Sequence, residues 1–182
     1  EGAIKLARKY SHEKYGKERS KILTLIQSFH GRTITTLKAT GQDKFHKEFF
    51  PLTDGFDYVK ANDIEDFKAK LTDDVCAIMM EAIQGEGGVL PLDKDFVQNV
   101  VNICNEKDIL VIFDEVQCGI ARIGKLFGYE NFDVKADIVT VAKGLGGGLP
   151  IGGFICSEKL KDVMKPGDHG STFGGNPVVC AG

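Results

Sequence analysis

Short, strongly apolar segments that alternate with helical segments constrain the fold of this sequence more than any other feature. A strand that is apolar on both faces must be buried on both faces, and a parallel sheet covered by helices meets that condition. Helical hydrophobic spacing lies between such segments, at residues 63–71 and 94–107. The apolar strands are predicted at residues 21–27, 75–83, 109–113 and 137–142. This alternation predicts an α/β fold with a mainly parallel sheet and helices on both faces.

The segment at residues 151–156 is a further apolar strand with a different direction. Only eight residues separate Ala142 from Ile151, and four of them are glycine. A parallel crossover needs a dozen or more residues. We therefore expect this strand to be antiparallel to its neighbour, which makes the sheet mixed.

Charge and cysteine content exclude several classes of protein. The chain of 182 residues has a formal net charge of −3, which gives no sign of nucleic-acid binding. Its five cysteines contain no C-x-x-C pair, so neither a disulfide framework nor a zinc or other metal site is indicated. No secretory signal and no membrane-spanning apolar segment is apparent. We expect a cytoplasmic protein that binds neither nucleic acid nor membranes.

Polar residues follow each of the four predicted parallel strands at its carboxyl end. Ligands of open α/β sheets bind beyond these ends. One such ending would be chance, but four at the same edge predict a functional site. The residues concerned are His30 and Arg32, Glu81 and Glu86, Asp114 and Gln117, and Lys143.

Asp114 and Lys143 follow two strands that we expect to be near neighbours. They could form a simple ion pair, although such a pair contributes little to stability. The alternative is that Lys143 is a nucleophilic amine and Asp114 faces a cationic group of a ligand. Pyridoxal 5'-phosphate (PLP) needs such a lysine for a Schiff base and an acidic partner for its pyridinium nitrogen.

Five motifs in these regions resemble the class III (subgroup II) PLP-dependent aminotransferases of fold type I. They cover nearly the whole chain in the order found in that family. The motifs are SFHGRT, EAIQGEGGV, FDEVQCGIARIGKLFGYE, AKGLGGGLPIGG and PGDHGSTFGGNP. The resemblance implies the PLP-binding large domain of such an enzyme.

The resemblance also implies roles for individual residues around the cofactor. Lys143 matches the catalytic lysine that holds PLP, and Asp114 matches the carboxylate at the pyridine nitrogen. Gln117 matches the side chain near the phenolic oxygen, whereas Val116 and Phe29 match residues on the two faces of the ring.

Three more residues match positions that bind phosphate or substrate in the family. Thr172 matches a threonine that binds the cofactor phosphate of the neighbouring subunit, which implies a homodimer with a shared active site. Arg32 matches the arginine that binds a substrate carboxylate. Glu86 matches a glutamate that pairs with an arginine near the C-terminus and releases it for the dicarboxylic substrate.

The resemblance places residues 1–182 in the central part of the large domain. The family's first phosphate-binding loop would precede Glu1, and its small C-terminal domain would follow Gly182. These missing parts leave the activity of the segment alone in question.

The expected reaction moves the terminal amino group of N2-acetylornithine to 2-oxoglutarate. Its products are N-acetylglutamate 5-semialdehyde and glutamate, in arginine biosynthesis. Ornithine or 4-aminobutyrate is the alternative amino donor within the family. A non-catalytic phosphate- or nucleotide-binding module is the alternative of another class, but GLGGG lacks the spacing of the known nucleotide-binding motifs.

Two further interpretations stay open from the sequence. His30 is either a core or capping histidine or an aromatic side chain of the site. Glu115 and Arg122 form either a solvated pair or part of a structural network.

Overall fold

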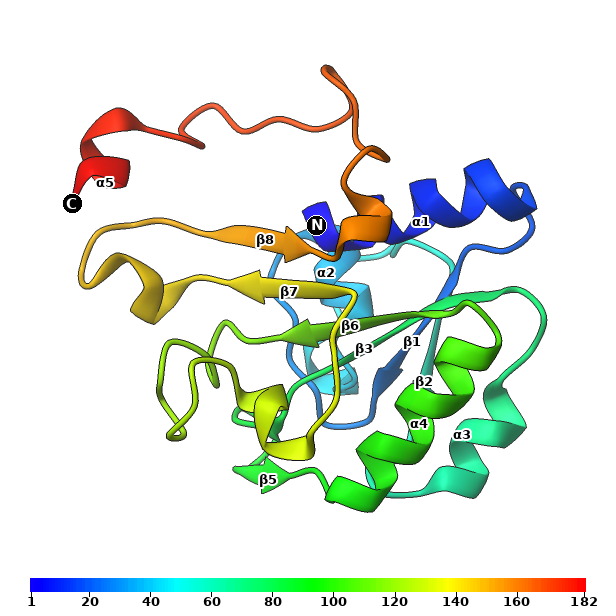
Figure 1. Cartoon of the computed structure of the whole chain (residues 1–182). Coiled ribbons are helices and arrows are strands. Elements are labelled where there is room, and N and C mark those ends of the chain that lie inside the picture. The colour runs from blue at the N-terminus through cyan, green and yellow to red at the C-terminus, as the bar shows by residue number, and fades with distance from the viewer.

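The computed structural model describes residues 1–182 as one mixed sheet with helices on both faces. Six strands lie in the order β2-β1-β3-β6-β7-β8 (Figure 1). Every pair is parallel except β7 with β8, which is antiparallel. The strands are β1 (Lys21–Leu25), β2 (Phe56–Val59), β3 (Val75–Met80), β6 (Leu110–Asp114), β7 (Ile138–Val141) and β8 (Gly153–Cys156). The predicted fold class is confirmed.

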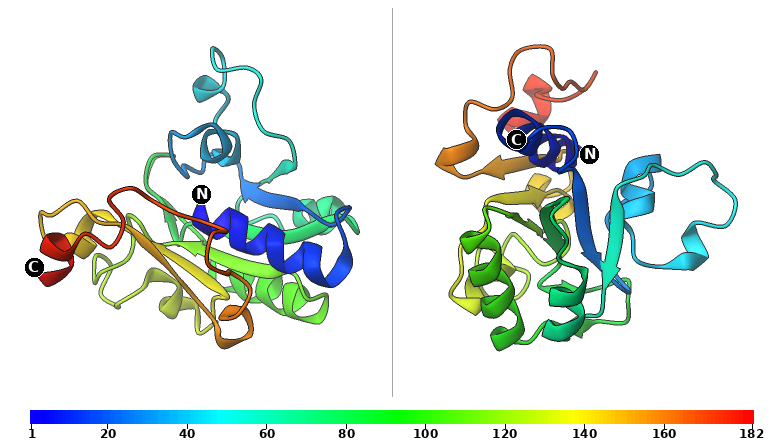
Figure 2. Two further views of the ribbon diagram at one scale, coloured as in Figure 1. Left: turned by 90° about the horizontal axis from the view of Figure 1, so that it is seen from above. Right: turned by 90° about the vertical axis from the view of Figure 1, so that its right-hand side faces the viewer.

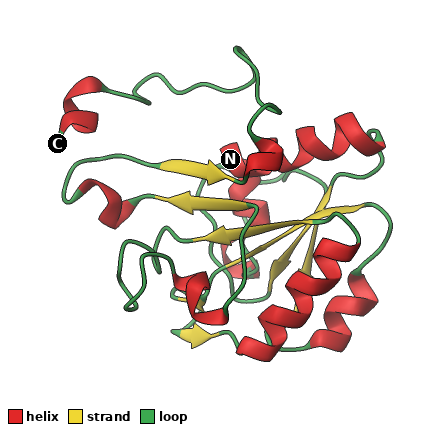
Figure 3. Ribbon diagram, viewed as in Figure 1, coloured by secondary structure: helices red, strands yellow, loops and turns green.

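Helices cover both faces of this sheet, as Figure 3 shows. α1 (Gly2–Tyr15) lies on one face, and α3 (Ile64–Lys70) and α4 (Lys94–Glu106) lie on the other (Figure 2). The remaining helices are α2 (Ile34–Ala39), α5 (Pro177–Ala181) and the short 3-10 helices η1 (Asp43–Phe45), η2 (Gly128–Phe132), η3 (Lys143–Gly146) and η4 (Glu158–Leu160).

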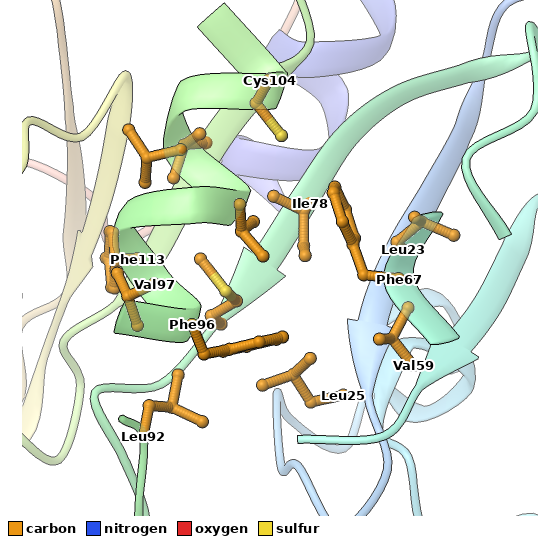
Figure 4. Close-up of a cluster of buried hydrophobic side chains, with 14 of the residues drawn as sticks. Leu23, Leu25, Val59, Phe67, Ile78, Leu92, Phe96, Val97, Cys104 and Phe113 are labelled. Atoms are coloured by element: carbon orange, nitrogen blue, oxygen red, sulfur yellow. The ribbon is translucent and has the colours of Figure 1, made fainter. Parts of the chain in front are cut away.

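The alternation of side chains along each strand builds two separate cores. Ile78 of β3 packs with Phe67 of α3 and Phe96 of α4 on one face, as Figure 4 shows. Its neighbour Ala77 packs on the other face with Ile4 of α1. Burial of this kind contributes about 25 cal/mol per Å² of apolar surface and holds the strands in register.

The last strand runs against its neighbours, as the short connection predicts. In Figure 1 the arrowheads of β6 and β7 point to one side and that of β8 to the other. Val141 at the end of β7 pairs with Gly153 at the start of β8. The glycine-rich connection therefore stays at the edge where the parallel strands end.

Some elements differ from the predicted ones. β3 ends at Met80 instead of continuing to residue 83, and the chain enters a small hairpin of β4 (Ile83–Gln84) and β5 (Leu90–Pro91). β2 and α2 were not predicted, since β2 is a half-buried strand at the sheet edge and α2 is too short for a clear hydrophobic period.

The C-terminal segment extends away from the sheet (Figures 1 and 2). Its final helix α5 is capped by Asn176, whose Oδ1 accepts hydrogen bonds from the N–H groups of Val178 and Val179. Separately, none of the helices combines the length and hydrophobicity needed to cross a lipid bilayer.

Candidate active site

The carboxyl ends of four neighbouring strands deliver titratable side chains to one pocket. In sheet order these are His30 after β1, Glu81 after β3, Asp114 at the end of β6 and Lys143 after β7. The pocket has a volume of about 100 Å³, and its other lining residues are Phe29, Gly31, Glu86, Val116 and Gln117. The predicted meeting of four strand ends is confirmed.

Asp114 is buried, and three donors hold its carboxylate. Nδ1 of His30 lies 2.8 Å from Oδ2, while the Thr140 hydroxyl and the Val116 N–H donate to Oδ1 over 3.0 and 3.2 Å. Because an ionised carboxylate only accepts, Nδ1 of His30 carries the proton. No ion pair joins Asp114 to Lys143, so the simple ion-pair interpretation was wrong.

His30 therefore belongs to the site and is not merely a core residue. Its side chain is fully buried, and its second ring nitrogen, Nε2, has no hydrogen-bond partner. Its backbone N–H donates to the Thr40 hydroxyl over 2.9 Å, which fixes the turn after β1. The ring is thus positioned by the turn on one side and by Asp114 on the other.

Glu115 is also buried but has a structural role. Its carboxylate accepts hydrogen bonds from the N–H groups of Gly128 and Tyr129 over 2.7 and 2.9 Å. Burial raises the pKa of this carboxyl, and the two hydrogen bonds oppose the rise. Of the two interpretations of Glu115, the solvated pair with Arg122 was wrong, and Glu115 instead belongs to a structural network with backbone amides of η2. Asp114, the last residue of β6, thus serves the pocket, and Glu115, which follows it, serves the next loop.

Lys143 begins η3 with an unusual backbone conformation. Its φ is 46°, in the left-handed region that non-glycine residues rarely adopt. Such a conformation costs about 1–3 kcal/mol and is concentrated at functional sites. The residue is exposed in the pocket wall, so its amine is accessible to a ligand.

Gln117 and Glu86 come together in the pocket as predicted from their positions at the strand ends, and Val116, which the resemblance implied, also lines it. Gln117 lies against Gly85, where an added Cβ would be 1.4 Å from its Oε1. A Cβ on Gly87 would be 2.5 Å from the carbonyl oxygen of Gln27. The glycines of QGEGG thus let the loop carrying Glu86 pack against two neighbouring segments.

Arg32 lies beside the pocket and does not line it. Its guanidinium carbon is 5.5 Å from the ring centroid of Phe29 and 4.8 Å from that of Phe45. Phe29 lines the pocket, whereas Arg32 lines another hollow, of about 270 Å³.

Thr172, like Arg32, is a predicted site residue that does not line the pocket. It is exposed in the extended C-terminal segment, and it is not among the residues that line the pocket. Asp168, earlier in the segment, pairs with Lys9 of α1. Thr172 thus lies outside the pocket of its own chain.

Glu81 is a pocket residue to which the sequence assigned no role. It is 5% exposed, and burial raises its pKa to about 7, with opposing effects from His30 and from the Phe29 N–H. The sequence did contain a signal that Glu81 belongs to the pocket. Glu81 directly follows the buried run VCAIMM, so an acidic residue stands at a strand end there, as Asp114 does at another.

A larger hollow lies at the opposite edge of the sheet. It measures about 570 Å³ and is lined by residues around the starts of β1, β3 and β6, among them Arg19 and Asp74. Asp74 pairs with Lys21, and Arg19 donates to main-chain carbonyls. Because the carboxyl-end pocket gathers an amine, three carboxyls and an imidazole, it is the candidate active site.

Solved structures of similar fold are aminotransferases. The ornithine aminotransferase of Toxoplasma gondii has a TM-score of 0.93 and is 35% identical, covering 99% of this chain and 44% of that one. In one of its structures the active site holds PLP at partial occupancy. An omega-transaminase of Thermomicrobium roseum has a TM-score of 0.91 and is 31% identical, over 100% of this chain and 46% of that one.

Curated relatives point to the same class of enzyme. The acetylornithine aminotransferase of Haemophilus ducreyi is 58% identical over 100% of this chain and 46% of its own length. That of Caldanaerobacter subterraneus is 60% identical, again over 100% of this chain and 46% of its own length. This chain therefore spans about half the length of these relatives.

Asp114 and Lys143 lie at the carboxyl ends of adjacent strands in a mixed α/β sheet, and the solved structures with this fold are aminotransferases. The sequence pattern of the class-III aminotransferases matches residues 1–182. The chain belongs to the class-III aminotransferase family.

Proposed function

We propose that this chain is the central part of the PLP-binding large domain of an acetylornithine aminotransferase. The enzyme moves the terminal amino group of N2-acetylornithine to 2-oxoglutarate and gives N-acetylglutamate 5-semialdehyde and glutamate, in arginine biosynthesis. One observation carries the proposal. A pocket lined by both Lys143 and the hydrogen-bonded Asp114 occurs in a chain that is 58–60% identical to enzymes of that name.

The residues of the pocket fit PLP. A buried carboxylate that accepts three hydrogen bonds suits a cationic ring nitrogen, and Asp114 meets this condition. Lys143 supplies an accessible amine, while Phe29 and Val116 supply apolar walls for a flat ring. Gln117 provides a carboxamide for a polar ring substituent.

PLP supplies, when bound, an electron-withdrawing ring that stabilises negative charge at the amine-bearing carbon of the substrate. Asp114 would keep a proton on the ring nitrogen, and His30 holds Asp114 in place. Lys143 would hold the cofactor through Nζ. Its free amine would serve as the general base and acid for the proton at the amine-bearing carbon of the donor.

Arg32 and Glu86 are assigned to substrate recognition. The guanidinium of Arg32 lies next to Phe29, which lines the pocket, and a guanidinium suits a carboxylate of the donor. Glu86 lines the pocket and would mask a second arginine, outside residues 1–182, when the substrate has no second carboxylate. Accordingly, Glu86→Ala should slow the acylornithine half-reaction more than the glutamate half-reaction in single-turnover measurements.

The functional unit in this proposal is a homodimer with shared sites. A pocket of about 100 Å³ is smaller than the roughly 300–1,000 Å³ typical of ligand sites, so further chain is needed to enclose the cofactor. Thr172 lies in the segment that extends from its own subunit, and its hydroxyl is assigned to the cofactor phosphate of the partner.

Subunit exchange tests this shared site. Thr172→Ala and Lys143→Ala dimers should each be inactive. Hybrids of the two carry both lesions in one site and leave the other site intact, so mixing should restore activity. Two variants that stay inactive after verified exchange would show that the site is not shared.

Comparison of amino donors tests the proposed activity. The full-length protein that contains this chain should have a higher kcat/KM for N2-acetylornithine than for ornithine, 4-aminobutyrate or succinyldiaminopimelate. Each comparison uses saturating 2-oxoglutarate and the same enzyme preparation. A preference for ornithine or 4-aminobutyrate would replace the proposed substrate but keep the reaction class. Absence of amino transfer from all four donors would remove the proposal.

Ornithine is the second candidate donor. The fold of this chain superposes on ornithine aminotransferase with a TM-score of 0.93, although the identity is only 35%. The identity to acetylornithine aminotransferases is 58–60%, and this difference favours the acylated donor.

A further inference from the structure

Glu81 lines the pocket but has few partners. It follows the last residue of β3, and β3 lies between β1 and β6 in the sheet. Glu81 therefore stands between the strands that deliver His30 and Asp114. Its side chain accepts one hydrogen bond, from the Phe29 N–H to Oε2 over 3.0 Å, and no cation forms an ion pair with it. A buried carboxylate with so few partners is unfavourable in its ionised form.

We propose that Glu81 is a proton-exchanging carboxyl group of this pocket, which is ionised while Lys143 carries a positive charge and protonated when that charge is removed. The proposal rests on the proposed function only in taking Lys143 as the residue whose charge changes during turnover. The role itself follows from the burial of Glu81 and from the groups that surround it.

The charges facing Glu81 come from every neighbouring element and act with different signs. Lys143 on η3 and His30 after β1 favour its ionised form, whereas Asp114 on β6 disfavours it. Cys118, in the turn after β6, and Glu86, in the loop after β4, are the other titratable groups nearby. Burial is the largest effect and raises the pKa of Glu81 to about 7.

This pKa makes the ionisation of Glu81 sensitive to the charge of Lys143. At neutral pH a change in one nearby charge moves a group with a pKa near 7 between its two forms. When Lys143 loses a proton, the Glu81 carboxylate takes one up from Lys143 or from solvent, and the net charge of the pocket is preserved. When Lys143 regains its proton, Glu81 releases one.

Infrared difference spectroscopy of the full-length, cofactor-free protein tests the proposal without any turnover. The C=O stretching band of a protonated carboxyl is followed as the pH changes through 7. Glu81→Gln identifies the band, because the amide oxygen can still accept from the Phe29 N–H but cannot titrate. Glu86→Gln is the matched control, since it removes another pocket carboxyl and should leave the band in place.

Four results are expected. The band should have a midpoint near pH 7 in the wild type and vanish in Glu81→Gln. The midpoint should move up in Lys143→Ala, where a positive charge is lost, and down in Asp114→Asn, where a negative charge is lost. Opposite shifts distinguish electrostatic coupling from a general loosening of the pocket.

An unchanged midpoint in Lys143→Ala, or a Glu81 that stays ionised throughout, would overturn the proposal. The wild type and Lys143→Ala decide the matter even if Glu81→Gln does not fold. These outcomes do not depend on the amino donor, so the proposal can fail while the aminotransferase activity stands, and the reverse also holds.

Discussion

Charged side chains differ in their number of hydrogen-bond partners between the two edges of the sheet, the one where the parallel strands begin and the one where they end. At the edge where the strands begin, Asp108 accepts hydrogen bonds from Tyr10, Tyr15 and Lys14, and Arg19 donates to three carbonyl oxygens. At the other edge, Glu81 has one hydrogen bond, and Nε2 of the buried His30 has none. The larger hollow lies at the first edge, yet the reactive groups gather at the second.

This difference separates polar groups that stabilise the fold from groups kept ready for a ligand. The hydrogen bonds of Asp108 hold its pKa below the usual range, although burial alone would raise it. At Glu81 burial prevails, and the pKa rises. Substitutions at the first edge should therefore change stability, and substitutions at the second should change chemistry.

Lys143→Ala should have the largest effect on chemistry. The account expects loss of turnover by at least the roughly 10²–10⁴-fold that a general acid or base contributes. Steady-state rates of the full-length variant measure this, and circular dichroism checks that the fold persists. Retention of wild-type turnover would contradict the conclusion that the residues where the strands end carry the chemistry.

Asp114→Asn should slow proton abstraction severely in a folded protein. A charge-assisted hydrogen bond contributes about 1.5–3 kcal/mol, so a loss of at least tenfold in the single-turnover rate is expected. The amide keeps the shape of the side chain and can still accept from Thr140 and Val116. Unchanged turnover would refute the assignment of Asp114.

Glu81→Gln should alter the pH dependence of stability. The pKa of Glu81 is raised from 4.5 to about 7, so the folded state holds a proton that the unfolded state releases between these values. Wild-type stability should fall as pH rises through this window, by about 3 kcal/mol at most, at about 1.4 kcal/mol per pH unit. Urea unfolding at pH values on both sides of this window should show a smaller fall in the free energy of unfolding for Glu81→Gln than for the wild type. An equal fall in the two proteins would contradict the prediction.

Asp108→Asn, at the edge where the strands begin, should have the smallest effect on chemistry. Loss of the carboxylate that accepts from Lys14 and two tyrosines should destabilise the fold by about 1–3 kcal/mol. Asparagine tolerates the left-handed backbone at this position, where φ is 50°. Urea unfolding measures the loss, and kcat should stay at the wild-type value. A large fall in kcat without a loss of stability would contradict the assignment of Asp108 to the stability of the fold.

The sequence predicted the sheet and many of the residues that line the pocket, because both depend on local patterns. Apolar runs locate β3 and β6, and the short connection before β8 determines its direction. The pairing of His30 with Asp114 could not be predicted. β3 lies between their strands, so the contact depends on how far the turn after β1 reaches across the sheet.

Arg32 and Thr172 show the other limit of the sequence patterns. Their motifs place them after β1 and in the C-terminal segment, but their distance from the pocket depends on tertiary packing. Arg32 packs near the ring of Phe29 and lines another hollow. β2 and α2 were missed because strand and helix periods are weak in short, half-buried segments.

Reduction of the loaded full-length enzyme with borohydride tests the central claim most directly. Borohydride fixes the cofactor to the lysine that holds it, and peptide mapping then identifies that lysine. The account predicts loss of the visible absorption band and a single modified peptide that contains Lys143, at the edge where the strands end. Modification of Lys125 or Lys165 instead, with an unmodified Lys143, would contradict the account.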